Sequence, residues 1–351
     1  VSVDPLNAAP ALSAGMRAAY SENGTAVALG SGVTITDADD INLSGAVLEI
    51  TSGYTPGDSL ALPSGTATAT GISGSWDAST RKLTLSATTT PVSLANYQSA
   101  ISAVTFSSTS NDPTANGTAT SRQISIQVRD ANRDGALNPD GTRSAGALSN
   151  SAGATITLTA AGDAPVLQHG NTTTLSYTEA GAALAISPAL TISDADDSQL
   201  QKASVQISSG LSDGDRLNYT AISGISGSYD SATGLLSFSG TASISDYQSL
   251  LRSVTYSSSS SNPAGTASRG FTWKVVDANS DGAGAQASTA VSNTINVVGI
   301  NQAPTLQIAP TALAYGENDP AAALAADLTL SDLDSTQLSG ATVSISAGYS
   351  A

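Results

Sequence analysis

The sequence predicts an all-β protein made of tandem β-sandwich domains, each with one short helix. Three observations carry this prediction: short runs of alternating apolar and polar residues, turn residues between them, and markers that recur at the interval of a whole domain. Alternation with a period of two is typical of half-buried strands. Many short strands separated by glycine, proline, aspartate and serine favour a sandwich.

The strand-like runs recur in the same order along the chain. They lie at 33–35, 47–50, 83–85, 104–106, 124–128 and 156–158, with later counterparts at 190–192, 205–207 and 271–276. One pattern differs, because the apolar residues at 94, 97, 101 and 104, and again at 244, 247, 251 and 254, have helical spacing. We therefore expect a short helix before a late strand of each domain. The alternating threonines and alanines at 66–70 are expected to form a strand or a loop.

Three sets of markers divide the chain into repeats. An Ala-Pro pair opens each repeat, a glutamate follows at Glu22, Glu179 and Glu317, and an Asp-x-Asp pair comes third. The predicted boundaries are 1–162, 163–301 and 302–351, the last being the start of a third, truncated sandwich. We expect the chain to be a piece of a longer protein.

Composition limits the function classes. The chain has 12 basic and 28 acidic residues, a net charge of −16, and only 11% charged residues, so the acids are sparse and gather in loops. Without a basic patch, nucleic acid is not an expected partner. No apolar run is long enough to insert in a membrane. The absence of cysteine and the single His169 make zinc and iron–sulfur centres poor candidates.

Two acidic motifs recur at the ends of strand-like runs. The first supplies Asp130, Asn132 and Asp134, and again Asp277, Asn279 and Asp281, each time closed by a glycine. Oxygen ligands at alternate positions with a sharp turn are suited to Ca²⁺. The alternative is an ordinary solvated turn. A free-standing EF-hand does not fit, because Gly141 stands where the loop needs a bidentate glutamate.

The second motif supplies Asp37 and Asp39, Asp194 and Asp196, and Asp332 and Asp334, with Asp40 and Asp197 extending the first two copies. These acids are either solubilising loop residues or ligands, since adjacent like charges repel unless a cation neutralises them. Strand alternation places Glu22 and Asp112 at the bottom of one domain and Asp194, Asp196 and Asp277 at the top of the next. With Asp163 in the linker, they are expected to converge on one junction. Glu179 is the next domain's counterpart of Glu22.

This arrangement resembles the cadherin-like modules, and more closely the tandem cadherin-like repeats of giant bacterial surface adhesins of the RTX, biofilm-associated type. The run 162–167 (Gly-Asp-Ala-Pro-Val-Leu), the turn 227–230 and the run 247–256 carry the resemblance. It implies a Ca²⁺-stiffened extracellular spacer on a bacterial cell surface. Its partners would be the neighbouring repeats, together with a cell-surface or matrix ligand bound through other domains. Asn7 and Asn301 replace the linker aspartate, and Asn262 stands where Asp112 is expected, so the last junction is expected to bind fewer ions.

Two other functions remain open at this point. The domains could themselves bind a glycan or a protein, which would require an exposed groove with clustered aromatics, or they could be subunits of an extracellular filament or surface layer. An enzyme is not expected, because the chain has one histidine and only 4% aromatic residues.

Overall fold

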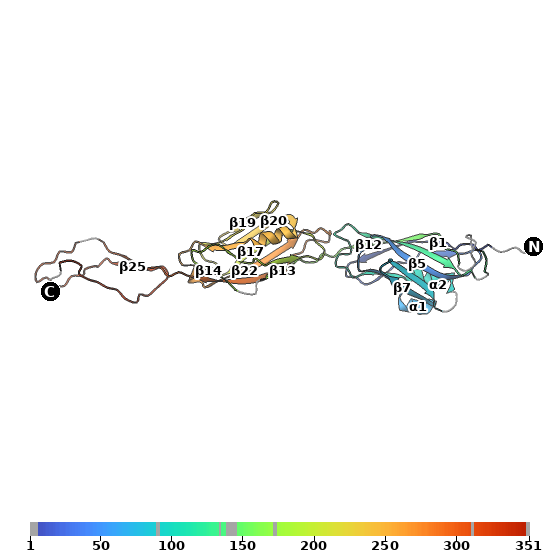
Figure 1. Ribbon diagram of the computed structural model, residues 1–351, viewed down its shortest axis with the longest axis horizontal. Helices are drawn as coiled ribbons and strands as arrows, with labels where there is room; N and C mark the ends of the chain where they lie inside the picture. Colours follow the sequence, from blue (N-terminus) through green and yellow to red (C-terminus); the bar gives the residue numbers. More distant parts are fainter. Residues whose placement is uncertain are drawn as a thin grey trace, which may run out of the picture. The chain divides into compact units, whose positions relative to one another are not determined.

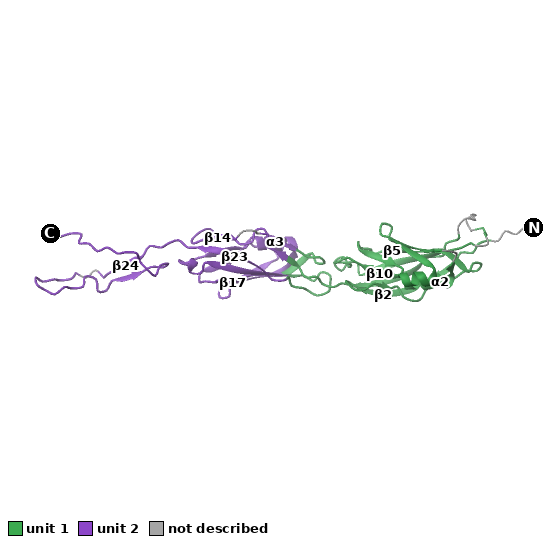
Figure 2. Cartoon of the chain, turned by 90° about the horizontal axis from the view of Figure 1, so that it is seen from below, with its two compact units in different colours: residues 1–166, 193–201, 276–288 green, residues 167–192, 202–275, 289–351 purple. Residues whose placement is uncertain are grey.

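The computed structural model describes residues 6–88, 92–132, 135–137, 146–170, 174–309 and 312–348. Strands dominate, so the all-β prediction is confirmed. The described residues form two compact units (Figure 2): unit 1 comprises 1–166, 193–201 and 276–288, and unit 2 comprises 167–192, 202–275 and 289–351. Unit 1 therefore includes residues 193–201 and 276–288, which lie beyond the predicted boundary at 163. Within the described part of the chain, none of the helices is long and apolar enough to cross a membrane.

Unit 1 contains two main sheets (Figure 1). The larger has the order β2-β12-β11-β5-β8-β7, with β9 on β5, and the smaller has the order β3-β10-β6, while β1 pairs with β4. The strands are β1 (Ala11–Ser13), β2 (Gly15–Ser21), β3 (Val27–Ala28), β4 (Thr34–Thr36), β5 (Asn42–Ser52), β6 (Asp58–Ala61), β7 (Ile72–Asp77), β8 (Lys82–Ala87), β9 (Val92–Ser93), β10 (Thr105–Ser108), β11 (Ser121–Asp130) and β12 (Ala152–Thr159). β2 and β12 pair in parallel over seven residues.

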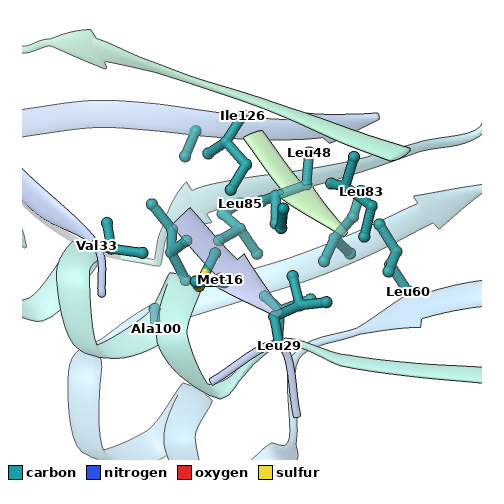
Figure 3. Close-up of a cluster of buried hydrophobic side chains, with 14 of the residues drawn as sticks. Met16, Leu29, Val33, Leu48, Leu60, Leu83, Leu85, Ala100 and Ile126 are labelled. Carbon is teal, nitrogen blue, oxygen red and sulfur yellow. The ribbon is translucent and has the colours of Figure 1, made fainter. Parts of the chain in front are cut away.

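The core of unit 1 lies between these sheets (Figure 3). Leu48, Leu85 and Ile126 point inward from the large sheet and meet Leu60 of β6. Residues of β5 alternate between buried and less buried positions, as expected for a strand with one face on a core. Because both sheets contribute side chains to one cluster, the unit is a β-sandwich.

The helix expected near residue 94 is α2 (Leu94–Ala103), whose N-cap Ser93 accepts a bond from the Asn96 amide at 3.3 Å. The expectation of a strand or loop at 66–70 is wrong, because residues 64–70 form a second helix, α1 (Ser64–Thr70). Gly71 ends it in a left-handed conformation, φ 70°. The Thr70 hydroxyl donates to the Thr66 carbonyl at 2.7 Å, within the helix. The threonine–alanine alternation therefore does not mark the two faces of a strand.

Unit 2 has the same plan. Its sheets have the orders β14-β23-β22-β17-β20-β19 and β15-β21-β18, and β13 pairs with β16. The elements are β13 (Val166–Gln168), β14 (Leu175–Thr178), β15 (Leu184–Ala185), β16 (Thr191–Ser193), β17 (Gln199–Ser209), β18 (Asp215–Asn218), β19 (Ser226–Asp230), β20 (Leu235–Ser243), α3 (Ile244–Arg252), β21 (Thr255–Ser258), the 3-10 turn η1 (Pro263–Gly265), β22 (Ser268–Asp277) and β23 (Val291–Val298). α3 is the helix expected from the spacing at 244–254.

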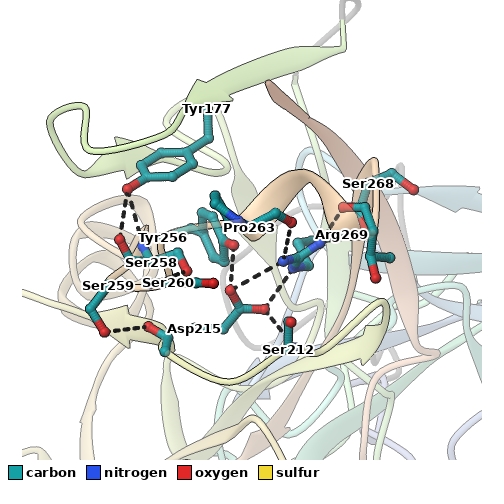
Figure 4. Close-up of polar contacts among 12 residues, drawn as sticks. Tyr177, Ser212, Asp215, Tyr256, Ser258, Ser259, Ser260, Pro263, Ser268 and Arg269 are labelled. Carbon is teal, nitrogen blue, oxygen red and sulfur yellow. Dashed lines mark hydrogen bonds and ion pairs between the residues drawn. The ribbon is translucent and has the colours of Figure 1, made fainter. Parts of the chain in front are cut away.

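Each unit contains one buried ion pair between its two sheets. Arg122 of β11 bonds Asp58 of β6 with an Nε–Oδ2 distance of 2.5 Å, and both side chains are fully buried. Arg269 of β22 bonds Asp215 of β18 at 2.6 Å, also fully buried (Figure 4). Both arginines occupy the second position of their strand.

The last segment of unit 2 is different. Here β24 (Thr305–Gln307) pairs only with β25 (Thr329–Ser331). Large apolar side chains such as Leu306 and Tyr315 are 61% and 62% exposed, although the corresponding Leu167 and Tyr177 are buried. The segment therefore has strand pairing but no core of its own among the described residues.

Candidate metal centres

The first group of predicted ligands in unit 1 surrounds the residues that precede β1. Asp37 follows β4, and its Oδ1 accepts bonds from the amides of Asp39 and Asp40, both at 3.3 Å. Asp39 Oδ2 accepts a bond from the Ala8 amide at 2.8 Å. Burial, together with the neighbouring Asp39, raises the pKa of Asp37 to about 6. A carboxyl group that is buried beside another acid is more stable when it is protonated or when it binds a cation.

The late strand β11 contributes to the same group. A register shift between Arg129 and Asp130 interrupts the pairing with β5, and such a bulge re-aims the side chain that follows. Asp130 is fully buried; its Oδ2 accepts bonds from Asn7 Nδ2 and the Ala147 amide, each at 2.8 Å, while Oδ1 has no partner. Asn132 adopts φ 40° and also has a buried side-chain oxygen without a partner. Asp134 lies outside the described residues.

The second group gathers around Glu22, immediately after β2. The Glu22 amide donates to the Thr159 carbonyl at 2.9 Å, which continues the parallel pairing. Its carboxylate is buried, 6% exposed; Oε2 accepts the Ala161 amide at 2.9 Å, and Oε1 has no partner. The polypeptide leading into Asp163 thus folds over the Glu22 side chain.

The loop after β16 brings three more carboxylates to this group. Asp163 donates its amide to Asp196 Oδ2 at 2.7 Å. The Asp194 Oδ1 accepts bonds from the amides of Asp196 and Asp197 at 3.3 and 3.2 Å, as Asp37 does in the first group. Ligand oxygens of Asp194, Asp196 and Asp197 lie within 4.8 Å of one another. Asp194 Oδ2 and Asp196 Oδ1 are buried and have no partner, and Asp196 is only 1% exposed.

The loop after β22 closes over the same carboxylates. Asp277 is fully buried and accepts bonds from the amides of Asn279, at 3.1 Å, and Gln286, at 2.7 Å. Asn279 sits at φ 57°, the conformation that brings the loop round. The Ser280 amide and hydroxyl both donate to Asp197 Oδ1. Asp281 is 9% exposed, and its Oδ2 has no partner.

Asp112 enters from the loop between β10 and β11. Its carboxylate accepts the Asn116 amide at 2.9 and 3.0 Å, and the Asn116 side chain lies 3.4 Å from the Ser280 hydroxyl. A pocket of about 360 Å³ is lined here by residues that include Asn111, Asp163 and Asp194. All of these residues belong to unit 1.

Three carboxylates of the second group have raised pKa values, because they are buried close to other acids. Burial raises the pKa of Glu22; the bond from Ala161 opposes this effect, and Asp163, Asp112 and Asp281 add to it. Burial and then Asp194 raise the pKa of Asp196 to about 8. Burial also raises the pKa of Asp277, opposed by two amide bonds and increased by Asp197 and Asp194. In the described part of the chain, the ion pairs seen involve Glu49, Asp58 and Asp215, and none of these acids.

A third group lies in unit 2. Glu179 is buried and accepts the Ile300 amide at 2.9 Å and Gln302 Nε2 at 3.2 Å. Asp334 Oδ2 accepts the Gln302 amide at 2.7 Å, and Asp334 Oδ1 has no partner. Amide bonds, chiefly from Asp334, lower the pKa of Asp332. This group repeats the geometry of the second group with fewer carboxylates.

Sequence reasoning identified most of these acids but did not predict the hydrogen bonds that several polar residues make to them. Asn7, Asn116, Ser280 and Gln302 bond the acidic loops directly. For Asn7 and Gln302 a signal existed, since each lies within two residues of the alanine of an Ala-Pro marker. Asn116 and Ser280 are unremarkable in sequence, and only the folded loops bring them into place.

No protein-family model matches the chain, and no curated protein does. Among solved structures, protocadherin gamma B7 extracellular cadherin domains 1–4 is 13% identical over 93% of this chain and 60% of that one, with a TM-score of 0.32. Mouse cadherin-23 EC22–24 is 13% identical over 94% of this chain and 79% of that one, also with a TM-score of 0.32.

The protocadherin gamma B4 extracellular domain gives a TM-score of 0.33 at 13% identity, with 95% of this chain and 39% of that chain covered. The chain thus spans less than two thirds of the length of these protocadherins. All three TM-scores are low.

Proposed function

We propose that the chain is a calcium-stiffened spacer made of tandem sandwich repeats, at 1–162, 163–301 and 302–351, from an extracellular adhesin. One observation carries the proposal. Glu22, Asp196 and Asp281 are each at least nine-tenths buried, and each holds a carboxylate oxygen without a partner within one acidic group. Buried, unpaired carboxylates are costly unless they are neutralised. A bound cation would remove that cost.

The donor set fits Ca²⁺. Every candidate ligand is an oxygen, from carboxylates and from two side-chain amides, and Ca²⁺ accepts six to eight oxygens in flexible geometry. Glu22, Asp112, Asp163, Asp194, Asp196, Asp277, Asn279 and Asp281 would hold ions in the second group. Asp37, Asp39, Asp130, Asn132 and Asp134 would do so in the first, and Glu179, Asp332 and Asp334 in the third. Mg²⁺ needs a stricter octahedral geometry and gives up its water reluctantly, so it should replace Ca²⁺ poorly.

The mechanical role follows from which repeats supply the ligands. Glu22 and Asp112 come from the first repeat, Asp163 comes from the linker, and the remaining second-group ligands come from the second. Without metal, these like charges repel across a short linker. With metal, both repeats share one group of ligands, so the linker is held. Extracellular Ca²⁺ near millimolar is sufficient for weak sites of this kind.

The glycan-binding alternative finds no support in the hollow on the outer face of the large sheet of unit 1. That hollow has a volume of about 420 Å³ and is lined by residues that include Glu49, Lys82, Gln127 and Arg129. None of its described lining residues is aromatic, so it lacks a stacking surface for a sugar.

Calorimetric titration and thermal melting test the proposal. We expect Ca²⁺ to bind and to raise the melting temperature, by an amount corresponding to about 2.7 kcal/mol at a concentration one hundred times Kd. Asp196→Asn should weaken binding without unfolding the protein. Asp230→Asn is a matched control, because Asp230 is an exposed turn acid outside all three groups. Identical melting curves with Ca²⁺ and with a chelator would contradict the proposal.

A further inference from the structure

We propose that the buried Arg122 positions the loop that carries Asp112 and so sets the calcium affinity of the second group; this inference rests on the function proposed above. We call Arg122 with Asp58, and Arg269 with Asp215, the arginine clamps. In each clamp the guanidinium donates hydrogen bonds to other groups in addition to the carboxylate of its paired aspartate. Arg122 also donates to the Thr55 hydroxyl at 2.9 Å, and in both clamps the guanidinium holds two backbone carbonyls of one loop.

The first clamp holds both sides of that loop. Arg122 Nη2 donates to the Pro113 carbonyl at 2.5 Å, and Nη1 donates to the Ala119 carbonyl at 2.9 Å. Asp112 immediately precedes Pro113. The planar guanidinium has five donors in a fixed fork, so it can hold two carbonyls and a carboxylate at once. The buried guanidinium between the two sheets therefore fixes the backbone next to Asp112.

The loop that carries Asp112 has a strained backbone, so contacts with Arg122 are needed to keep its conformation. Ala115, Asn116 and Gly117 have φ values of 50°, 52° and 73°. Two consecutive non-glycine residues in the left-handed region are unfavourable, and they persist only where surrounding contacts fix them. This turn places the Asn116 amide on Asp112 and the Asn116 side chain beside Ser280. Loss of the clamp should let the turn relax and move Asp112.

The second repeat contains the same device (Figure 4). Arg269 Nη2 donates to the Pro263 carbonyl at 3.0 Å, and Nη1 donates to the Thr266 carbonyl at 2.6 Å. Asn262, immediately before that proline, donates to the Leu333 carbonyl at 2.9 Å, between Asp332 and Asp334. Each clamp thus holds the loop that contacts the following acidic loop.

Stability alone does not explain these pairs. A buried ion pair is often no more stabilising than apolar residues of similar volume, because desolvation offsets the attraction. A positioning role gives the charged pair a purpose that apolar residues could not serve, since only the guanidinium reaches both loop carbonyls.

The test uses the double variant Asp58→Asn/Arg122→Met, which leaves no unpaired buried charge. Calorimetric Ca²⁺ titration should show Kd for one class of site about tenfold higher, the range found when residues behind metal ligands are changed. Hydrogen exchange in metal-free protein should become faster at the amides of Asn116 and Ala119 and remain unchanged at Ile126 of the core.

Two further variants make the result decisive. Arg122→Lys keeps a cation beside Asp58 but cannot hold both carbonyls, so it should raise Kd and loop exchange as well. Asp215→Asn/Arg269→Met alters only the second clamp and should leave exchange at 112–119 unchanged. A folded Arg122→Lys or double variant with wild-type Kd and wild-type loop exchange would overturn the inference. If the wild-type protein binds no Ca²⁺, the proposed function fails, and the exchange data alone then decide whether the clamp holds the loop.

Discussion

Two carboxylates, Asp37 and Asp196, lie in environments that oppose their ionisation. Asp37 and Asp196 have pKa values raised to about 6 and about 8, mainly by burial. A residue whose folded pKa exceeds its unfolded value stabilises the folded state below the unfolded pKa, and that contribution is lost as pH rises through the folded pKa. The charge that would bind a cation therefore destabilises the metal-free protein.

The metal-free protein should accordingly lose stability between about pH 5 and pH 8. Melting temperatures of exhaustively dialysed protein across this range measure the effect. Saturating Ca²⁺ should remove most of the slope, since the bound ion keeps the carboxylates ionised. His169 acts in the opposite direction, because burial lowers its pKa, so a His169→Gln variant should show a steeper decline. If the melting temperature of the metal-free protein rose from about pH 5 to about pH 8, the raised pKa values of Asp37 and Asp196 would be wrong.

Ala180 has a backbone conformation that suits another residue. It follows Glu179 at φ 52°, whereas Asn23 and Asn318 hold the same position after the other two glutamates, at 56° and 66°. Left-handed backbone costs a non-glycine residue roughly 1–2 kcal/mol, and asparagine tolerates it best. Ala180→Asn should therefore stabilise by about 0.5–1 kcal/mol in urea unfolding. The reverse change, Asn23→Ala, should destabilise the protein by a similar amount. If both variants had the same free energy of unfolding as the wild-type protein, this explanation would be wrong.

At the scale of elements, the helices α2 and α3 depend on their N-caps. Ser93 and Ser243 accept bonds from the amides of Asn96 and Asp246 at 3.3 and 3.1 Å, and Ser243 also donates to the Asp246 carboxylate at 2.7 Å. Ser243→Ala should cost about 1 kcal/mol and Ser93→Ala somewhat less. Chemical denaturation measures both. Ser99→Ala within α2 removes a hydroxyl that caps nothing, and a comparable loss there would show that capping is not the cause.

The sequence predicted elements where a single local pattern decides them. Period-two alternation located β5, β8, β11 and β17, and helical spacing located α2 and α3. It failed for α1, where the threonine–alanine alternation imitates a strand although residues 64–70 form a helix that contacts α2. Strand direction alone suggested that Glu22, Asp112 and Asp194 approach one another, and the structure brings them into unit 1. The Arg122–Asp58 pair could not be predicted, because its members lie on different sheets and nothing in the sequence links them.

At the scale of the whole molecule, Ca²⁺ should change the distribution of conformations more than the secondary structure. The sheets are complete without metal, whereas the linker around Asp163 is held chiefly by polar contacts. Small-angle scattering should show a narrower range of conformations in Ca²⁺ than in chelator, with nearly constant far-UV circular dichroism. The Asp277→Ala variant should show a smaller difference between the scattering profiles in Ca²⁺ and in chelator. Unchanged scattering with Ca²⁺ demonstrably bound would limit the ions to a local stabilising role.

The parallel pairing of β2 with β12 also bears on how a repeat resists tension. A pull on both chain ends draws β2 toward its N-terminus and β12 toward its C-terminus, so the hydrogen bonds between them are sheared together and cannot open one at a time. Among the described residues, seven such pairs join β2 and β12, and four join β14 and β23. In single-molecule stretching we therefore expect the first repeat to rupture at the higher force. Of these two repeats in a tether, the second would yield first and lengthen under load.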